Sequence, residues 1–352
     1  MVDPSFPLID LHRHLDGSVR LETILELGRQ HNIPLPAQDL EGLRPHVQML
    51  PDQSGDTAMP GVMAFIAKFK WMMAVLVDYD ACRRVAYENV EDLRLEGIDY
   101  AELRFSPWFM AETHDLDPTG VVEAVLEGAE AGARDFGIKV KMIGIISRTY
   151  GLEAGWRELQ ALLPFRDRLV ALDLAGDEAN WPASLYVEHF RQARDTGWQI
   201  TVHAGESAGS ESVWQSIRDL GATRIGHAVA AIEDTALLDH MAEHQIGVES
   251  SLTSNVQTSV VPSYADHPIR RFIKHGLLVT LNTDDPGISA IDLRHEYKVA
   301  APAAGLSEEQ VHQAQRNALT VAFLSDDERE NLRVARAQAQ LQEIPDRGAE
   351  EL

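Results

Sequence analysis

Short apolar runs recur along the whole chain, and each one ends in polar or small residues. Helix-like stretches lie between the runs, so the pattern indicates βα units that build a parallel sheet. Eight such units predict an α/β fold of the (β/α)8 TIM-barrel type, because the polar residues gather at the carboxyl ends of the runs, where barrel active sites lie. An open, doubly wound sheet is the competing arrangement. The eight predicted strands are Leu8–Asp16, Ile98–Pro107, Val140–Arg148, Leu169–Glu178, Gln199–Glu206, Thr223–Val229, Ile246–Asn255 and Leu277–Pro286. The predicted helices between them include Leu21–Gln30, Ala81–Glu96, Gly120–Phe136, Ser184–Thr196, Ser210–Leu220, Glu233–Glu243 and Pro268–His275.

Two regions exceed what a minimal barrel needs. Residues 39–77 follow the first unit and contain an apolar helical stretch, Ala64–Leu76, so they predict an insertion of extra helices over the barrel mouth that could act as a substrate lid. Plain core packing of the aromatic residues in this stretch is the alternative. Helical patterns at Asp292–Ala300 and Ser307–Leu319 follow the last strand, and the polar segment Pro345–Leu352 predicts a frayed tail. No linker or repeat divides the sequence, so we expect residues 1–352 to form a single domain.

Charge and cysteine content exclude several classes of protein. Lys and Arg number 31 against 55 Asp and Glu, a formal charge of −24, which disfavours binding to nucleic-acid backbones and to anionic membrane surfaces. Cys82 is the only cysteine, so neither an internal disulfide nor a cysteine-rich metal site can form. Met1–Pro7 lacks the pattern of a signal peptide, and the longest apolar run, Met72–Val77, is too short to span a membrane. We therefore expect a cytoplasmic protein whose partner is a small molecule; the sequence does not predict its oligomeric state.

The first predicted strand carries the first candidate site. Side chains alternate between the two faces of a strand, so Asp10, His12, His14 and Asp16 are expected to point into the barrel. Two histidines one residue apart on one strand face can bind one metal ion. Alone this short motif has low specificity.

The ends of three later strands carry the same kinds of side chain. His203 and Glu206 end the fifth run, His227 ends the sixth, and Asp284 and Asp285 stand side by side at the end of the eighth. Adjacent carboxylates disfavour each other's ionisation unless a cation compensates. A nitrogen-rich ligand set with one carboxylate suits Zn2+ with water at an open position, and such an ion brings the pKa of that water to about 7. The predicted zinc ligands are His12, His14, His203 and Asp284, which leaves Glu206, His227 and Asp285 for proton transfer and orientation.

Taken together and in chain order, these motifs resemble those of the adenosine deaminase family of the amidohydrolase superfamily. The resemblance extends from Asp10 to at least Tyr297, and it departs from the family at Ala228, where glycine usually follows the histidine. The matching segments are His12–Gly17, Leu172–Glu178, His203–Glu206, Gly226–His227 and Asn282–Pro286.

The resemblance implies a role for each site residue. His12, His14, His203 and Asp284 would hold one zinc ion per chain, whose water, activated by His227 and Asp284, attacks C6 of the purine of adenosine. Glu206 would give a proton to N1, Asp285 would contact N7, and the backbone of Gly176 would contact N3. Asp16, with His14 nearby, would contact the ribose 5′-hydroxyl. The products would be inosine and ammonia, with 2′-deoxyadenosine as a second substrate and purine salvage as the role.

Finer choices within the superfamily also rest on the resemblance. Binuclear members bridge two metals with a modified lysine at the end of the fourth strand, and Ala175–Glu178 contains no lysine, so one metal is expected. Relatives that deaminate free adenine usually have Glu where this chain has Asp16, and the shorter side chain favours a nucleoside over the base.

Rival functions remain open from the residues alone. Gly205–Gly209 matches the Gly-x-Ser-x-Gly elbow of serine hydrolases, which would make Ser207 a nucleophile with Asp284 and His295 downstream. His240–His244 matches an inverted zinc-peptidase pattern, although a barrel would place that helix on its outer ring, away from the mouth. An adenine deaminase and a barrel that binds without turnover are further alternatives.

Overall fold

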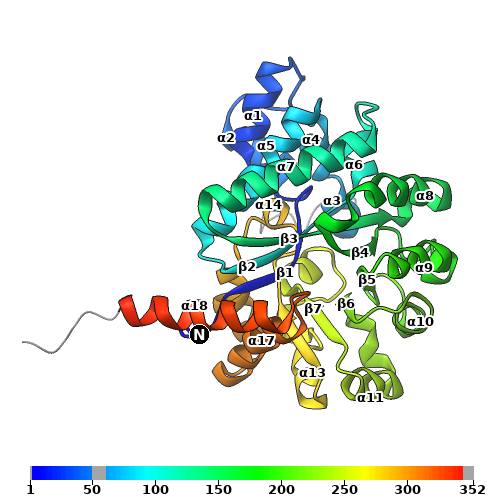
Figure 1. The fold of residues 1–352 in the computed structure, drawn as a ribbon, viewed down its shortest axis with the longest axis vertical. Coiled ribbons are helices and arrows are strands. Elements are labelled where there is room, and N and C mark those ends of the chain that lie inside the picture. The colour runs from blue at the N-terminus through cyan, green and yellow to red at the C-terminus, as the bar shows by residue number, and fades with distance from the viewer. Residues whose placement is uncertain (1, 50–60, 344–352) are drawn as a thin grey trace, which may run out of the picture.

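A (β/α)8 barrel is the architecture of the protein, as a computed structural model of residues 2–49 and 61–343 shows (Figure 1). Each strand pairs in parallel with the next one in the chain. The ring closes where His14 donates its backbone N–H to the carbonyl of Asp284 at 2.8 Å and Asp284 donates to the carbonyl of His12 at 2.8 Å. This closure confirms the predicted barrel over the open sheet. The strands are β1 Ile9–His14, β2 Tyr100–Phe105, β3 Lys139–Ser147, β4 Leu169–Ala175, β5 Gln199–Ala204, β6 Arg224–His227, β7 Gly247–Ser250 and β8 Leu278–Leu281.

Helices surround the strands on the outside (Figure 1). Their ends follow local signals: α5 stops at Gly97 in the left-handed conformation, and α17 begins with a capping box between Ser307 and Gln310. The helices that follow the strands are α1 Leu21–Gln30, α5 Tyr79–Glu96, α6 Pro107–Glu112, α7 Pro118–Phe136, α8 Gly151–Leu162, α9 Val187–Asp195, α10 Ser210–Gln215, α11 Thr235–Glu243, α12 Leu252–Gln257, α13 Ile269–His275, α14 Pro286–Ser289, α15 Leu293–His295, α16 Ala301–Ala303, α17 Glu308–Val321 and α18 Asp326–Glu343.

Polar side chains make up much of the inside of the barrel, beside aliphatic ones such as Ile143 and Ile145, whereas barrels usually pack mainly branched aliphatic residues there. Leu103, Val202 and Val248 face outward toward the helices and are fully buried. The residues that alternate with them, such as Arg104 and Glu249, meet across the barrel. The alternation therefore places apolar residues under the helices and a charged network inside, beneath the carboxyl ends of the strands.

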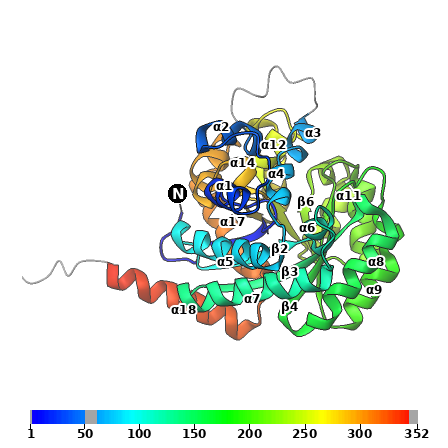
Figure 2. The ribbon, with the colours of Figure 1, turned by 90° about the horizontal axis from the view of Figure 1, so that it is seen from above.

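In the part of the insertion after α1 that the structure describes, residues 39–49 and 61–77, there are three short helices: α2 Leu40–Val47, α3 Gly61–Ile66 and α4 Phe69–Ala74. The backbone N–H of Met49 donates to the carbonyl of Ile288 in α14 at 2.8 Å, and α3 contacts α12. Figure 2 shows α2, α3, α12 and α14 on the same side of the molecule. Since α12 and α14 follow the carboxyl ends of β7 and β8, the insertion does lie at the barrel mouth.

The predicted helical stretch Ala64–Leu76 is helical in the structure but is divided by a turn. The chain turns between α3 and α4, where Ala67 and Lys68 donate their backbone N–H groups to the carbonyls of Met63 and Phe65. Lys68 also donates its ammonium to the carbonyl of Pro45 at 2.6 Å, which ties this turn to the end of α2.

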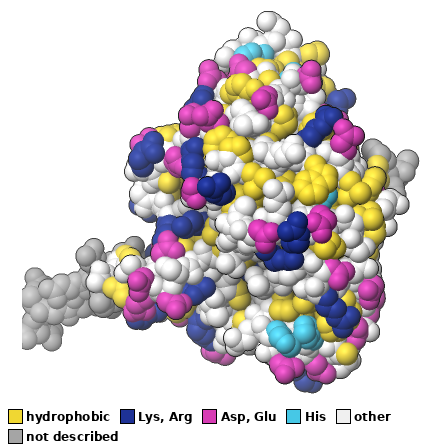
Figure 3. All heavy atoms as spheres, turned by 45° about the vertical axis from the view of Figure 1, so that its right-hand side comes forward, with side chains coloured by type: hydrophobic (Ala, Val, Ile, Leu, Met, Phe, Trp, Pro, Cys, Tyr) yellow, Lys and Arg dark blue, Asp and Glu magenta, His cyan; other side chains and the backbone are white. Residues whose placement is uncertain are grey.

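The outer surface carries charges of both signs. Over the face drawn in Figure 3, acidic and basic side chains are interspersed with apolar ones, without a continuous basic patch among the described residues. None of the helices in residues 2–49 and 61–343 is long and apolar enough to cross a bilayer. The predicted tail, Pro345–Leu352, lies outside the described residues.

Candidate active site

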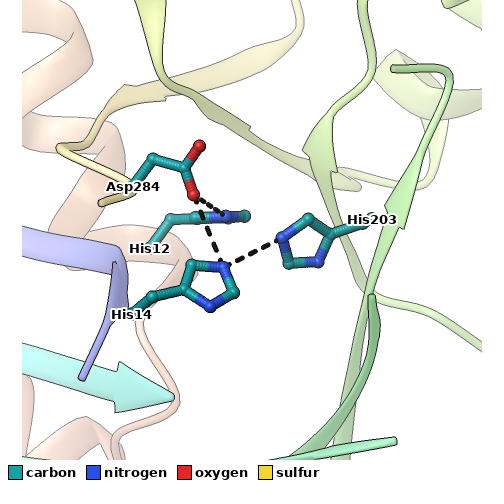
Figure 4. A group of neighbouring side chains, drawn as sticks. All are labelled: His12, His14, His203 and Asp284. Carbon is teal, nitrogen blue, oxygen red and sulfur yellow. Dashed lines mark hydrogen bonds and ion pairs between the residues drawn. The ribbon is translucent and has the colours of Figure 1, made fainter. Parts of the chain in front are cut away.

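Four predicted ligands converge at the carboxyl end of the barrel (Figure 4). His12 and His14 come from β1, His203 from β5, and Asp284 from the turn after β8. Asp284 Oδ1 lies 3.2 Å from His12 Nε2 and 3.4 Å from His14 Nε2, and His14 Nε2 lies 3.2 Å from His203 Nε2. Their donor atoms all lie within 4.8 Å of one another, so one ion could contact all of them.

The surroundings of two histidines show that this cluster fits a metal ion. His12 Nδ1 faces Glu249 Oε2 at 2.7 Å, and His203 Nδ1 faces Asp173 Oδ2 at 3.0 Å. A carboxylate on one ring nitrogen fixes the ring and leaves the other nitrogen free for a metal, as in many metal sites. The buried Nε2 of His12 lies 3.2 Å from Asp284 Oδ1 but forms no hydrogen bond of good geometry with the described residues. An unpartnered buried nitrogen is costly unless it has a ligand.

Arg104 lies directly beneath these two carboxylates. Its guanidinium donates to Asp173 Oδ2 at 2.7 Å and to Glu249 Oε2 at 2.8 Å, and all three side chains are fully buried. Burial alone would raise the pKa of both carboxyls. Arg104, together with His203 at Asp173 and Arg224 at Glu249, outweighs that effect and holds each pKa below its ordinary value. Both carboxylates therefore stay charged and can orient the histidines.

Glu206 lies on the loop after β5, beside the cluster. Its Oε2 is 3.8 Å from His227 Nε2. Burial raises the pKa of Glu206, and the charges of Asp284 and Glu178 add to this effect, so its protonated form is favoured. The carboxylate of Glu178 accepts backbone N–H groups from four consecutive loop residues, 205 to 208, at 2.6–3.1 Å, which fixes the loop.

Asp16 and Asp285 form a second acidic edge of the site, next to His14. Asp16 Oδ2 accepts the backbone N–H of Ser106 at 3.1 Å, while Oδ1 lies 3.5 Å from His14 Nδ1. Asp285 is buried, and burial together with the neighbouring Asp284 raises its pKa well above the ordinary value. Its Oδ1 has no hydrogen-bond partner among the described residues, so it is available to a ligand.

Several backbone positions at the site have positive φ, among them Gly176, Ala228 and Asp284. Gly176 follows β4 with φ +101°, and a side chain there would collide with Thr149. Ala228 follows His227 with φ +55°. That conformation favours glycine and disfavours a methyl-bearing residue, which gives a physical reason for the glycine that the family usually has there.

Comparison with known proteins assigns the chain to a family. The family model for adenosine deaminase matches residues 7–337. An adenosine deaminase from Edwardsiella ictaluri (strain 93-146) is 60% identical over 336 residues, which cover 96% of this chain and 99% of that protein. The chain belongs to the adenosine deaminase family. It is therefore a hydrolase of the amidohydrolase superfamily, as its sequence motifs predicted.

Solved structures of more distant proteins share the family's fold. An adenine deaminase from Arthrobacter aurescens superposes with a TM-score of 0.85 at 22% identity, covering 96% of this chain and 99% of that one. An amidohydrolase with bound Zn from Burkholderia ambifaria superposes with a TM-score of 0.84 at 23% identity, covering 96% and 92%. At such identities the likeness confirms the barrel fold alone.

The rival motifs do not form sites in this member of the adenosine deaminase family. His240 lies on α11 and His244 directly after it, on the outside of the barrel, where the His240 ring contacts both Trp214 and His244. Ser207 is exposed, its backbone N–H bonds Glu178, and none of the described histidines lies within hydrogen-bond distance of its hydroxyl. The family assignment likewise gives no support to an esterase.

Sequence reasoning missed the residues that support the ligands. Arg104, Glu249 and Asn255 each lie within or just after a predicted strand, and we assigned none of them a role. A charged residue in the middle of a buried apolar run was the available signal, since burial of an unpaired charge is too costly to be accidental.

Removal of Arg104 is expected to destabilise the fold strongly. In Arg104→Met the buried negative charges of Asp173 and Glu249 would repel each other, because the guanidinium that now bonds both of them would be absent. Breaking a buried ion pair from one side costs about 3–5 kcal/mol. Urea unfolding of the metal-free variant and parent measures this loss, and a difference below about 1 kcal/mol would mean that Arg104 is not what balances the two charges.

Proposed function

We propose that this protein catalyses the zinc-dependent hydrolytic deamination of adenosine, and of 2′-deoxyadenosine, to the inosine form and ammonia. The observation that carries the proposal is the convergence of His12, His14, His203 and Asp284 at the barrel mouth, with Glu206 and His227 beside them. The adenosine deaminases at 57–60% identity support the substrate. A role in purine salvage, in the cytoplasm, follows from this activity as part of the proposal.

The four converging donors would hold one zinc ion per chain. Three imidazole nitrogens and one carboxylate suit Zn2+, and a distant relative of the same fold contains zinc. When bound, the ion would lower the pKa of a water molecule and so supply a nucleophile near neutral pH.

The chain's own residues would then bind and polarise the purine. Glu206, whose pKa is raised, would donate a proton to N1, which makes C6 a better electrophile. His227 and Asp284 would orient the attacking water, since His227 Nε2 lies 4.0 Å from Asp284 Oδ2 on the same side of the site. Burial and the neighbouring Asp284 raise the pKa of Asp285, which would help it to donate a hydrogen bond to N7. The backbone at Gly176 would contact N3.

Asp16 is proposed to recognise the ribose. We expect Asp16→Ala to lower kcat/KM for adenosine by about 10- to 100-fold, because a hydrogen bond to a charged group contributes about 1.5–3 kcal/mol. Turnover of free adenine, which lacks the ribose, should not fall. Steady-state kinetics on both compounds measures the effect, and an unchanged value for adenosine would remove Asp16 from the ribose site.

The substrate itself is tested by offering adenosine, 2′-deoxyadenosine and adenine separately to the zinc-loaded protein. Loss of purine absorbance together with ammonia release reports deamination. The proposal predicts rapid conversion of both nucleosides and little of adenine. Preferential turnover of adenine would keep the site chemistry and overturn the substrate, whereas a folded, zinc-loaded protein that is silent on all three would overturn the function.

A further inference from the structure

His227 is linked through two buried side chains to the start of a helix. Its Nδ1 lies 3.0 Å from Asn255 Nδ2, and Asn255 Oδ1 lies 3.2 Å from His267 Nε2. His267 Nδ1 lies 3.1 Å from the backbone nitrogen of Ile269, the first residue of α13. All three side chains are at most 3% exposed, so water does not compete for these bonds.

The backbone N–H of Ile269 fixes the donor and acceptor of every hydrogen bond in this series from Ile269 back to His227. The backbone N–H of Ile269 can only donate, and at the first position of a helix it has no acceptor within that helix. His267 Nδ1 must therefore be the unprotonated nitrogen, so in the neutral ring the proton lies on Nε2. Burial lowers the pKa of His267 to about 3, which keeps the ring neutral.

The same reasoning passes through Asn255 to His227. His267 Nε2–H donates to Asn255 Oδ1, which turns the amide nitrogen of Asn255 toward His227. An amide NH2 can only donate, so His227 Nδ1 must accept. A neutral His227 then carries its proton on Nε2, the nitrogen that faces Glu206 and Asp284 at 3.8 and 4.0 Å.

We propose that Asn255 and His267 are positioning residues that hold His227 in the tautomer with the proton on Nε2. This rests on the proposed function and narrows it. With Nδ1 occupied by the amide and Nε2 already protonated, His227 has no free nitrogen with which to take a proton from the attacking water. It donates a hydrogen bond into the site and stabilises the oxygen that adds to C6, and the carboxylate of Asp284 would accept the proton from the water.

Nuclear magnetic resonance tests the tautomer directly, without turnover. Long-range 1H–15N correlations of the imidazole rings distinguish a protonated from an unprotonated ring nitrogen, and the signals of His227 are assigned by their loss in His227→Gln. In the parent protein, with and without zinc, we expect Nδ1 of His227 to be unprotonated and Nε2 to be protonated. A proton on Nδ1 in the parent would overturn the proposal.

The variant Asn255→Asp reverses the direction of the bond at almost unchanged shape. An ionised carboxylate can only accept, so His227 Nδ1 should gain a proton. We expect kcat for adenosine to fall by about 10²–10³-fold, the effect of losing one preorganised donor, while KM changes less than about threefold. An unprotonated Nδ1 in the variant, or a kcat equal to that of the parent, would overturn the proposal.

Two further variants separate the effect of hydrogen-bond direction from general damage to the structure. His267→Gln offers an oxygen to Ile269 and an NH2 group to Asn255, so it should preserve the tautomer and keep kcat within about threefold of the parent. Thr258, directly after α12, donates its hydroxyl to the carbonyl of Ser254 and takes no part in the hydrogen bonds that link His227 to Ile269. The variant Thr258→Val should therefore leave the His227 signals unchanged. If Asn255→Asp does not fold, the spectrum of the parent protein still shows which ring nitrogen of His227 carries the proton. A parent protein without activity on adenosine would overturn the proposed function but would leave the assignment of the tautomer unaffected.

Discussion

Glu206→Gln is expected to lower kcat for adenosine by about 10²–10⁴-fold, the usual contribution of a positioned general acid. Glutamine has nearly the same shape and can still accept hydrogen bonds, but it has no acidic proton to give to N1. The loop is fixed by Glu178 through backbone N–H groups, including that of residue 206, and these bonds do not involve the Glu206 side chain. The zinc content of the variant should therefore equal that of the parent.

Glu211→Gln is the matched control, because Glu211 is an exposed residue in the first turn of α10, a few residues further along. It should show parent kinetics. Steady-state rates and metal analysis of both variants measure the prediction. A Glu206→Gln protein that retains more than about a third of the parent kcat would show that the proton on N1 comes from another group.

His203→Ala is expected to abolish both zinc retention and turnover. His203 would supply one of four ligand atoms, and Asp173 holds its ring toward the other three. Loss of the metal's contribution, several kcal/mol, corresponds to a fall of about 10³-fold or more in kcat. Metal analysis after dialysis and the adenosine assay measure the two effects.

A histidine outside the site serves as the control for this loss. His240 on α11 contacts Trp214 and His244 on the outside of the barrel, so His240→Ala should keep both zinc and activity. If His203→Ala bound zinc and turned over adenosine as the parent does, the ion would have to lie elsewhere and the proposed site would be wrong.

Much of this architecture could be predicted because its signals are local. Seven of the eight predicted runs contain the observed strand, and the eighth misses only Lys139, the first residue of β3, since a buried strand needs a short apolar segment with polar residues at its end. The runs were predicted too long at their carboxyl ends. After β4 and β5 a left-handed glycine follows the strand directly: Gly176 has φ +101° and Gly205 has φ +70°. The site residues lie at these carboxyl ends, so the errors in predicted strand length fall next to the candidate active site.

The candidate ligands were predictable for a related reason, since they stand in short motifs at the ends of strands. The residues that orient them were not, because no spacing in the sequence relates them. Glu249 lies 237 residues from His12, and Arg104 lies 145 residues from Glu249. Only the closed barrel brings these side chains together. The local sequence signal for them is a charged residue inside an otherwise apolar run.

A zinc titration of the metal-free protein tests the central claim most directly. Inosine formation from adenosine is measured against the zinc bound per chain. The proposed site predicts no turnover without metal and a rate that rises in proportion to bound zinc until one ion is bound per chain. Full activity in the metal-free protein, or a rate that keeps rising to two ions per chain, would contradict a single zinc held by His12, His14, His203 and Asp284.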